Sequence, residues 1–525
     1  MSLRTAVLTT LGLSLLSVPA LADYQLTILH TNDFHARFEP ISGSDGPCAA
    51  ADNAAGACFG GVARLVTAVA DARARSSNAI LVDGGDQFYG TLFYTYYKGA
   101  MAAEFMNTLG YDAMTVGNHE FDDGPEVLRD FLDAVTFPVL MSNADVSGEP
   151  LLADRLAKST ILERGGARLG LIGLTPENTP ELASPGRNIV FTAPADALAE
   201  EVARLEAEGI DKIIVLSNSG YEVDLALAEA VPEVDVIVGG HSNTLLSNTQ
   251  EGAAGPYPTM VGTTAVVQAY AYGKFLGELN VTFDEAGVIL AAVGEPLLLD
   301  ASVAEDSATL ARVAELSAPL DEIRNQVVAE TAAPIEGDQD VCRAMECEMG
   351  NLVADAMLER VKDQGIQIAI ANAGGLRASI DVGEVTRGEV LTVLPFQNTL
   401  ATFQITGAQI VAALENGVSQ VEAGSGRFPQ IAGMRFVWDP AQAPGARIVE
   451  VMVKADGGSE PIDPEAVYGV VSSNFVRGGG DGYAMFTQAE EAYDFGPDLA
   501  DVTTEYLAAH APYTPFVAGR ITQAE

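Results

Sequence analysis

Gly117-Asn118-His119-Glu120-Phe121-Asp122 directly follows the apolar run Ala113–Val116, and the first half of the chain repeats this arrangement. Four other apolar runs also end in a turn that holds Asp, Asn or His. These runs and their turns are Tyr24–Leu29 with Thr31–His35, Ala79–Val82 with Asp83–Asp86, Ile213–Leu216 with Ser217–Gly220, and Val234–Val238 with Gly239–Asn243. In open α/β sheets, ligands bind at the carboxyl ends of the strands. The sequence therefore predicts one polar site built from five turns.

The side chains in these turns are typical of a divalent-metal site. Three of the five histidines in the chain lie there, namely His35, His119 and His241. Imidazole nitrogens together with carboxylate and amide oxygens bind divalent metals. Two aspartates, one of them able to bridge, are enough to hold two ions about 3.5–4 Å apart, which is the spacing used for phosphoester hydrolysis. For one turn alone, a helix cap or a buried structural histidine is the simpler interpretation. Five in succession favour the metal site.

The wider pattern predicts a layered α/β architecture with two units. From residue 24 to about 300, apolar runs, including Leu169–Ile172, alternate with helical patterns at 60–75, 98–109, 125–134, 194–208 and 223–230. Residues 302–331 have apolar side chains at helical spacing. A second unit follows, with a helix at 349–362 and strands near 367–372, 400–405, 446–454 and 467–473. We expect a catalytic domain at 23–301, a linker helix at 302–335 and a smaller α/β substrate-binding domain at 336–525.

Residues 1–22 resemble a secretory signal peptide. Arg4 precedes a short apolar core at 6–18, and Ala20-Leu21-Ala22 offers a cleavage site before Asp23. A membrane anchor is the alternative, but the apolar stretch is too short to span a bilayer. No later run approaches the necessary length, and the C-terminal residues are polar. We expect cleavage after residue 22, export to the periplasm or beyond, and no membrane insertion of the mature chain.

Charge and cysteine content narrow the function further. The chain has 28 Lys and Arg against 72 Asp and Glu, a formal net charge of −44. Such a surface repels nucleic-acid polymers, because their binding depends on neutralising phosphates. The four cysteines form two local pairs, Cys48 with Cys58 and Cys342 with Cys347. In an exported protein, two short-loop disulfides are the simplest arrangement, with reduced buried thiols as the alternative.

The second unit offers arginines and aromatic residues in glycine-rich turns rather than histidines. The relevant stretches are Cys342–Cys347, Asn372–Arg377, Leu394–Phe396 and Asn474–Gly482. The guanidinium group of arginine suits phosphate and carboxylate, and two phenylalanines can stack on a nucleobase. Taken singly, each phenylalanine could equally be a core residue, and each arginine a member of a surface ion pair.

These motifs, in this order, resemble the 5′-nucleotidase family of dinuclear metallophosphoesterases. The matching elements are Asp33-x-His35, Gly84-Gly85-Asp86, Gly117–Asp122 and Gly239–Asn243, and the C-terminal motifs fit as well. The family includes bacterial periplasmic UDP-sugar hydrolases and animal ecto-5′-nucleotidases. The resemblance covers nearly all of the mature chain. It implies a layered αββα metallophosphoesterase domain and hydrolysis of nucleoside 5′-monophosphates, with di- and triphosphates or UDP-sugars as further possible substrates.

The resemblance also implies a role for each site residue. Asp33 and His35 bind one divalent ion, Asp86 bridges, Asn118 and His241 bind the second ion, and Asn243 lies near the first ion or the substrate. His119, held by Asp122, contacts a phosphoryl oxygen or the leaving group, although Asp122 could also cap the helix expected near 125. In the C-terminal unit, the implied phosphate, ribose and base contacts are Arg343, Asn372, Arg377, Phe396, Phe475 and Asp481. The animal enzymes also have disulfides at the two cysteine pairs.

Asn218 departs from the family pattern, which has a histidine ligand at this position. An amide oxygen is a weaker and harder donor than imidazole. Either the second ion is held more loosely, or the preference moves from zinc toward manganese, magnesium or calcium. The two ions thus remain open among Zn, Mn, Co and Mg. Two other functions also remain open: a 2′,3′-cyclic nucleotide phosphodiesterase with 3′-nucleotidase activity, and a catalytically silent nucleotide-binding protein. The sequence does not address the oligomeric state.

Overall fold

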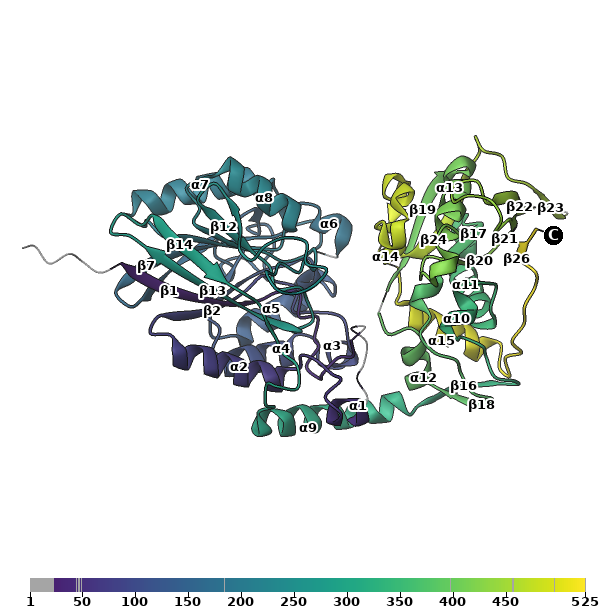
Figure 1. The fold of residues 1–525 in the computed structure, drawn as a ribbon, viewed down its shortest axis with the longest axis horizontal. Coiled ribbons are helices and arrows are strands. Elements are labelled where there is room, and N and C mark those ends of the chain that lie inside the picture. The colour runs from purple at the N-terminus through teal and green to yellow at the C-terminus, as the bar shows by residue number, and fades with distance from the viewer. Residues whose placement is uncertain are drawn as a thin grey trace, which may run out of the picture.

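The computed structural model describes residues 23–43, 45, 48, 50–183, 185–396, 398–455, 458–494 and 496–524. The expected signal peptide, residues 1–22, lies outside the described residues. Figure 1 shows two lobes with helix α9 (Ser307–Arg324) running along one side between them. We call the part built from β1 to β15 the N-terminal lobe and the part built from β16 to β26 the C-terminal lobe.

The first sheet of the N-terminal lobe has the strand order β14-β13-β1-β2-β3-β4, with β15 paired to β13. Strands β1 to β4 pair in parallel with one another, whereas β13 pairs antiparallel with β1 and β14. The bounds are β1 Tyr24–Thr31, β2 Ala79–Asp83, β3 Ala113–Thr115, β4 Val139–Leu140, β13 Phe275–Phe283, β14 Ile289–Gly294 and β15 Leu297–Leu298. The carboxyl ends of β1, β2 and β3 therefore share one edge.

The second sheet has the order β11-β12-β10-β9-β7-β6. Its inner strands β12, β10, β9 and β7 are parallel, and β11 and β6 close it on either side by antiparallel pairing. The bounds are β6 Ser159–Arg164, β7 Ala167–Leu174, β9 Ile213–Ser217, β10 Val236–Val238, β11 Thr259–Val261 and β12 Thr264–Val267. A short ribbon of β5 (Ala144–Asp145) and β8 (Val190–Phe191) lies outside both sheets.

The two sheets stack face to face and helices cover their outer faces. Alternate side chains of β1 show this, because Ile28 packs between the sheets and Leu29 packs toward the helices on the opposite face. The first sheet is covered by α2 (Val62–Arg75), α4 (Ala100–Leu109) and α5 (Pro125–Ala134), and the second by α7 (Pro194–Ala207) and α8 (Tyr221–Ala230). Shorter helices are α1 Ala50–Ala54, α3 Leu92–Tyr97 and α6 Thr179–Leu182. This is the expected αββα sandwich.

The C-terminal lobe is a smaller α/β unit around its own core. Its main sheet has the order β20-β17-β24-β19-β25, and a second sheet has the order β23-β22-β21-β26. The strand bounds are β17 Ile368–Asn372, β19 Leu400–Thr406, β20 Pro429–Ala432, β21 Met434–Trp438, β22 Ile448–Ala455, β23 Gly458–Pro461, β24 Val467–Ser473, β25 Glu490–Tyr493 and β26 Ile521–Gln523. The helices are α10 Gln339–Cys342, α11 Glu348–Val361, α12 Arg387–Val393, α13 Gly407–Gly417, α14 Asn474–Arg477 and α15 Leu499–Ala509.

The stretch expected to form the linker helix is helical only in part. Helix α9 spans Ser307–Arg324, and Asp306 caps its first turn by accepting a hydrogen bond from the Thr309 N–H at 2.8 Å. Residues Val327–Thr331 instead form strand β16, which pairs with β18 (Gly383–Thr386) of the C-terminal lobe. The last residues of the apolar pattern form a strand because they pair with β18, which is distant in the sequence. Apolar spacing along the chain cannot reveal such a partner.

Both expected disulfides are present in the described residues, Cys48–Cys58 in the N-terminal lobe and Cys342–Cys347 in the C-terminal lobe. The second one lies beside the start of α11, where Cys347 is the N-cap residue.

Candidate metal centre and substrate site

The five polar turns meet at one edge of the sandwich, as the sequence predicts. Backbone bonds tie the first turn to the second, because the N–H groups of Asp33 and His35 donate to the carbonyls of Gly85 and Asp86 at 2.9 and 3.1 Å. The fourth turn joins them, since Asn218 donates through Nδ2 to the Gly84 carbonyl at 2.8 Å. These turns belong to both sheets, so the site spans the sandwich.

The third and fifth turns complete the set. The His119 N–H donates to Asp86 Oδ1 at 3.0 Å, and the His241 N–H donates to Asp33 Oδ1 at 2.8 Å. His241 Nδ1 also lies 2.9 Å from Asn118 Oδ1. Hydrogen bonds thus join the Asp33 carboxylate to the His241 backbone and the His241 imidazole to Asn118, and they join the Asp86 carboxylate to the backbone of His119, the residue after Asn118.

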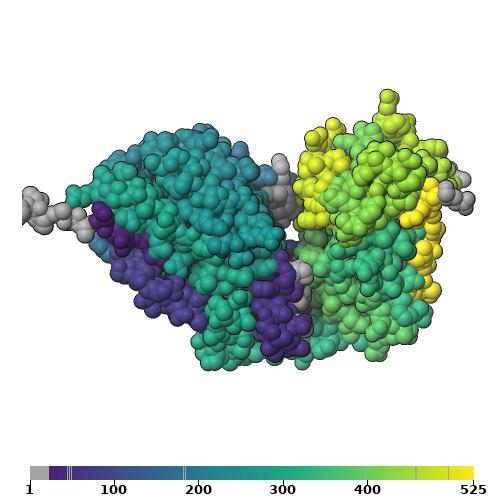
Figure 2. All heavy atoms as spheres, in the orientation of Figure 1, coloured from purple at the N-terminus to yellow at the C-terminus, as the bar shows by residue number. Residues whose placement is uncertain are grey.

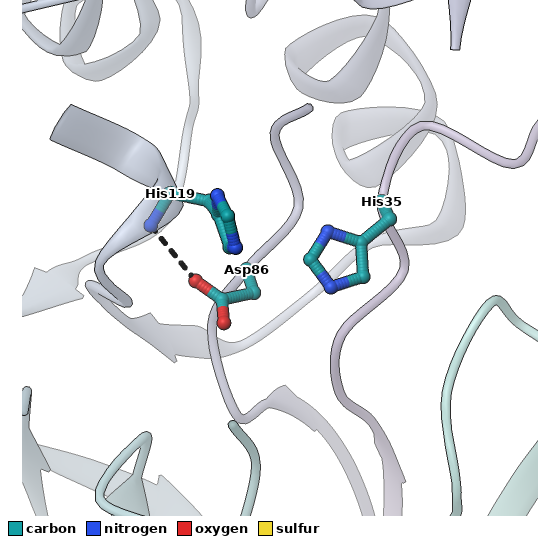
Figure 3. Close-up of side chains that lie close together, drawn as sticks. All are labelled: His35, Asp86 and His119. Carbon is teal, nitrogen blue, oxygen red and sulfur yellow. Dashed lines mark hydrogen bonds between the residues drawn. The ribbon is translucent and has the colours of Figure 1, made fainter. Parts of the chain in front are cut away.

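Three ligand-type side chains form the centre of this arrangement. One ligand atom from each of His35, Asp86 and His119 lies within 4.8 Å of the other two, a spacing that could hold a metal ion. Figure 3 shows the His119 imidazole next to the Asp86 carboxylate and the His35 imidazole across from both, each on its own stretch of chain. His35 is further fixed by its Nδ1, 3.1 Å from the Phe88 carbonyl oxygen.

The local backbone is unusual at these residues. Asp33, His35, Asp86, His241 and Asn243 all have a positive φ, between 49° and 70°. Left-handed non-glycine residues are uncommon, and they cluster at functional sites where the surroundings hold them. Glycine provides the room, because a Cβ at Gly117 would lie 2.2 Å from Asp86 Oδ1.

The two aspartates have opposite electrostatic environments. Burial and the neighbouring Asp86 carboxylate raise the pKa of Asp33 well above its usual value. Burial also opposes the charge on Asp86, but His119, His35 and His241 more than offset it and lower the pKa of Asp86. Burial lowers the pKa of His35 to about 3, so its imidazole is neutral and free to act as a ligand.

His119 and Asp122 form a pair beside this centre. Nδ1 of His119 lies 2.7 Å from Asp122 Oδ2. Burial disfavours a charged imidazole, but Asp122 and Asp86 outweigh it and raise the pKa of His119 to about 10. The helix-cap alternative for Asp122 is wrong, because Gly124 is the N-cap residue of α5.

Two amide oxygens in the site have no hydrogen-bond partner in the described part of the chain, and this fits a bound cation. Asn218 Oδ1 and Asn243 Oδ1 are buried without a hydrogen-bond partner among the described residues. A buried acceptor of this kind is costly unless something donates to it or coordinates it. With carboxylates and imidazoles beside them, these oxygens complete a donor set that suits divalent cations.

Glu120 is a structural member of the site to which sequence reasoning gave no role. Its fully buried carboxylate accepts four backbone hydrogen bonds, from the N–H groups of Asp86, Gln87, Phe88 and Gly117, at 2.6 to 3.2 Å. It therefore joins the turn after β2 to the turn after β3. The position of Glu120 inside the Gly117–Asp122 motif is the only signal in the sequence for this role. Its hydrogen-bond donors are backbone N–H groups, which every residue except proline has, so no residue type indicates them.

The predicted substrate residues of the C-terminal lobe also converge. Asn372 donates through Nδ2 to Asp481 Oδ2 at 2.7 Å. Arg377 lies over the ring of Phe396 at 5.6 Å from its centre. Burial lowers the pKa of Arg377, and the positive charge of Arg343 lowers it further. An anion between them would relieve this repulsion.

Two phenylalanines remain available at the surface. Phe396 is 36% exposed and Phe475 is 47% exposed, so neither is a core residue. Phe475 packs against the following turn, where a Cβ at Gly480 would lie 2.5 Å from its ring. Helix α14, which carries Phe475, lies on the side of its lobe that faces the N-terminal lobe, and Figure 2 shows a groove between the lobes there.

The comparisons with known proteins agree with this geometry. The calcineurin-like phosphoesterase family model matches residues 26–244, and the model of the 5′-nucleotidase C-terminal domain matches residues 327–488. The 5′-nucleotidase of Bos taurus is 38% identical over 99% of this chain and 94% of its own length. The chain belongs to the 5′-nucleotidase family.

Other family members support the assignment. The Homo sapiens 5′-nucleotidase is 38% identical over 96% of this chain and 92% of its own length. A solved 5′-nucleotidase precursor from Thermus thermophilus is 41% identical, with a TM-score of 0.68, over 95% of this chain and 99% of that one. As a member of this family, the protein is a phosphoric monoester hydrolase whose metallophosphoesterase part requires divalent metal ions.

Among the helices of the described residues, none has both the length and the apolar composition needed to cross a membrane.

Proposed function

We propose that this 5′-nucleotidase family member hydrolyses nucleoside 5′-monophosphates to nucleoside and phosphate, and that it accepts nucleoside di- and triphosphates or UDP-sugars as secondary substrates. One observation carries this proposal: five turns from two sheets bring Asp, His and Asn side chains to one point. The identity to the bovine 5′-nucleotidase over almost the whole chain supports it.

The proposed metal ligands fall into two groups around Asp86. Asp33 and His35 would hold one divalent ion, and Asn118, Asn218 and His241 the other, with Asn243 close to the first ion or the substrate. A pair of such ions supplies an activated water and offsets phosphoryl charge. Because Asn218 contributes oxygen where the family has imidazole nitrogen, we propose Mn²⁺ or Mg²⁺ in preference to Zn²⁺.

The chain's own residues orient the substrate around this centre. Asp122 fixes Nδ1 of His119, which leaves Nε2 to donate to a phosphoryl oxygen or to the leaving group. Arg343 and Arg377 attract the phosphate, Asn372 and Asp481 contact the ribose, and Phe396 and Phe475 stack on the base. The base clamp and the metal ligands belong to different lobes, so both lobes act on one nucleotide.

We also propose the division of the chain into a signal peptide at 1–22, a catalytic domain at 23–301, a linker at 302–335 and a nucleotide-binding domain at 336–525. Export to the periplasm or the medium follows from the signal-like N-terminus. Amino-terminal sequencing of the protein from the native host tests the cleavage site, and a mature chain that begins at Met1 would contradict it.

The activity itself is tested by phosphate release. The purified protein is loaded separately with Mn²⁺, Mg²⁺, Co²⁺ and Zn²⁺ and is given AMP, ADP, ATP, UDP-glucose or 2′,3′-cyclic AMP. We expect AMP to be hydrolysed fastest with at least one metal. Preferential turnover of 2′,3′-cyclic AMP would support the cyclic phosphodiesterase instead. Nucleotide binding without turnover under any metal would indicate a silent binding protein.

A further inference from the structure

Tyr89 lies in the turn that carries Asp86 and is neither a proposed metal ligand nor a proposed substrate contact. Its φ is +65°, a conformation that costs a bulky side chain free energy. Gly90 follows with φ +104°, and a Cβ there would lie 2.4 Å from the His35 carbonyl oxygen. The chain is therefore pressed against the His35 turn at this point, and the tyrosine is held in place despite its strain.

The Tyr89 ring is stacked on His119. The centroids of the two rings are 5.4 Å apart and their planes differ by only 7°. The His119 ring also contacts the His35 ring, but edge to face: the two centroids are 5.0 Å apart and the ring planes differ by 79°. The buried Tyr94 also packs against Tyr89, with the ring centroids 6.3 Å apart and the ring planes at 64°. This contact helps to hold the Tyr89 ring in place.

The stacking fixes the plane of the His119 ring, which the hydrogen bond from Nδ1 to Asp122 does not fix. The bond from Nδ1 to Asp122 fixes one nitrogen, but the terminal torsion of histidine is broad, so the ring can still tilt about that contact. A parallel aromatic face limits this tilt, and parallel aromatic pairs stabilise one another beyond the area they bury. The direction in which Nε2 points therefore depends on Tyr89.

We propose that Tyr89 is a positioning residue for the reaction: its ring sets the plane of the His119 imidazole. The proposal rests on the proposed function, because it needs His119 to act on the phosphoryl group. Burial raises the pKa of Tyr89, and the negative charges of Asp498 in the C-terminal lobe and of Asp122 raise it further. The ring thus stays uncharged, as a stacking role requires.

Two substitutions separate the ring from the hydroxyl group. Tyr89→Phe keeps the ring, and Tyr89→Gly removes it at a left-handed position where glycine is free of strain. We expect Tyr89→Gly to lower kcat for AMP about threefold to tenfold, with KM and metal affinity within about twofold of those of the original protein. We expect Tyr89→Phe to keep the original kcat, because the ring remains. Tyr96→Ala is the matched control, because Tyr96 is 52% exposed and packs on Tyr97 instead.

A spectroscopic measurement tests the geometry without turnover. The chain has five histidines, so selective ¹³C-histidine labelling gives few ring signals, and His119→Asn assigns the one that matters. We expect this signal to move in Tyr89→Gly and to stay in place in Tyr89→Phe and Tyr96→Ala. If it stays in place in Tyr89→Gly, or if Tyr89→Phe loses as much kcat as Tyr89→Gly, the proposal is wrong. A protein that hydrolyses no nucleotide would refute the proposed function, whereas the histidine signal would still decide whether Tyr89 orients the ring.

Discussion

Asp86 is the residue around which the site is organised. Its carboxylate accepts the His119 N–H, lies within 4.8 Å of a ring nitrogen of both His35 and His119, and is the like charge that raises the pKa of Asp33 in addition to burial. The glycine at position 117 leaves space for it, and Glu120 holds its backbone. A single side chain thus contacts the turns after β1 and β3 from the turn after β2.

Glu120→Gln tests whether the metal site depends on this backbone anchor. The amide replaces one acceptor oxygen with an NH₂ group that faces N–H donors, so at least one buried backbone group loses its partner. Loss of a group that orients metal ligands typically weakens metal binding about 10–100-fold, and we expect a loss in that range. Calorimetric titration with Mn²⁺ measures it. Glu126→Gln, on the exposed first turn of α5, is the control and should leave the titration unchanged. Equal titration curves for the original protein, Glu120→Gln and Glu126→Gln would rule out a role of Glu120 in metal binding.

Asn218→His tests the donor set. Asn218 Oδ1 is buried without a protein partner among the described residues, and imidazole is the softer and stronger ligand for zinc. We expect zinc affinity to rise about tenfold or more, which corresponds to about 1.4 kcal/mol, and the ratio of zinc to manganese affinity to rise with it. Competitive titration with a chelator gives both constants. An unchanged ratio would mean that residue 218 does not contact the metal.

The secondary-structure elements show what the sequence can and cannot predict. The polar turns after β1, β2, β3, β9 and β10 were predictable, because buried parallel strands have continuous apolar runs and their ends share one edge. Strand β16 was not, because its pairing with β18 depends on residues more than fifty positions away. The roles of Glu120 and Tyr89 were hidden for a similar reason: one binds backbone groups, and the other acts through ring geometry.

The Cys342–Cys347 disulfide gives a prediction for one element. It closes a short loop at the start of α11, with Arg343 inside it and Arg343 Nη1 3.2 Å from the Gly424 carbonyl oxygen. Replacing both cysteines with serine releases this arginine, and a charged hydrogen bond is worth on the order of 1.5 kcal/mol or more. We expect KM for AMP to rise about threefold or more. The Cys48→Ser, Cys58→Ser double variant in the other lobe is the control; an equal rise there would argue against a specific role for Arg343.

At the scale of the whole molecule, the lobes are joined mainly through α9. Tyr97 donates its hydroxyl to the Leu316 carbonyl at 2.9 Å, and Arg324 lies 3.2 Å from Glu39, so α9 is fixed to the N-terminal lobe. A cavity of about 690 Å³ lies between α9, α12 and the turn after β1. The two halves of the proposed nucleotide site therefore lie on two lobes that are connected by α9. The lobes do not pack completely against each other beside this helix, because the cavity separates them there.

The net charge of −44 predicts that salt stabilises the molecule. Like charges on a compact acidic surface repel each other, and the Debye length falls from about 30 Å at 0.01 M salt to about 3 Å at 1 M. We expect the midpoint of thermal unfolding to rise by several degrees over this range, and by the same amount in NaCl and KCl. A lower midpoint at high salt would show that the ion pairs contribute more than the repulsion.

Phe475→Ala tests whether both lobes act on one substrate. The exposed ring lies on α14, opposite the metal-binding lobe, and base–aromatic stacking is worth about 1–3 kcal/mol. Removing it should raise KM for AMP by about fivefold to a hundredfold. For p-nitrophenyl phosphate, which carries no base, KM and kcat should stay the same, because the metal centre is untouched. Phe516→Ala is the matched control, since Phe516 is 38% exposed on the same lobe but stacks on Arg520. Equal losses with both substrates would mean that Phe475 supports the fold rather than the base.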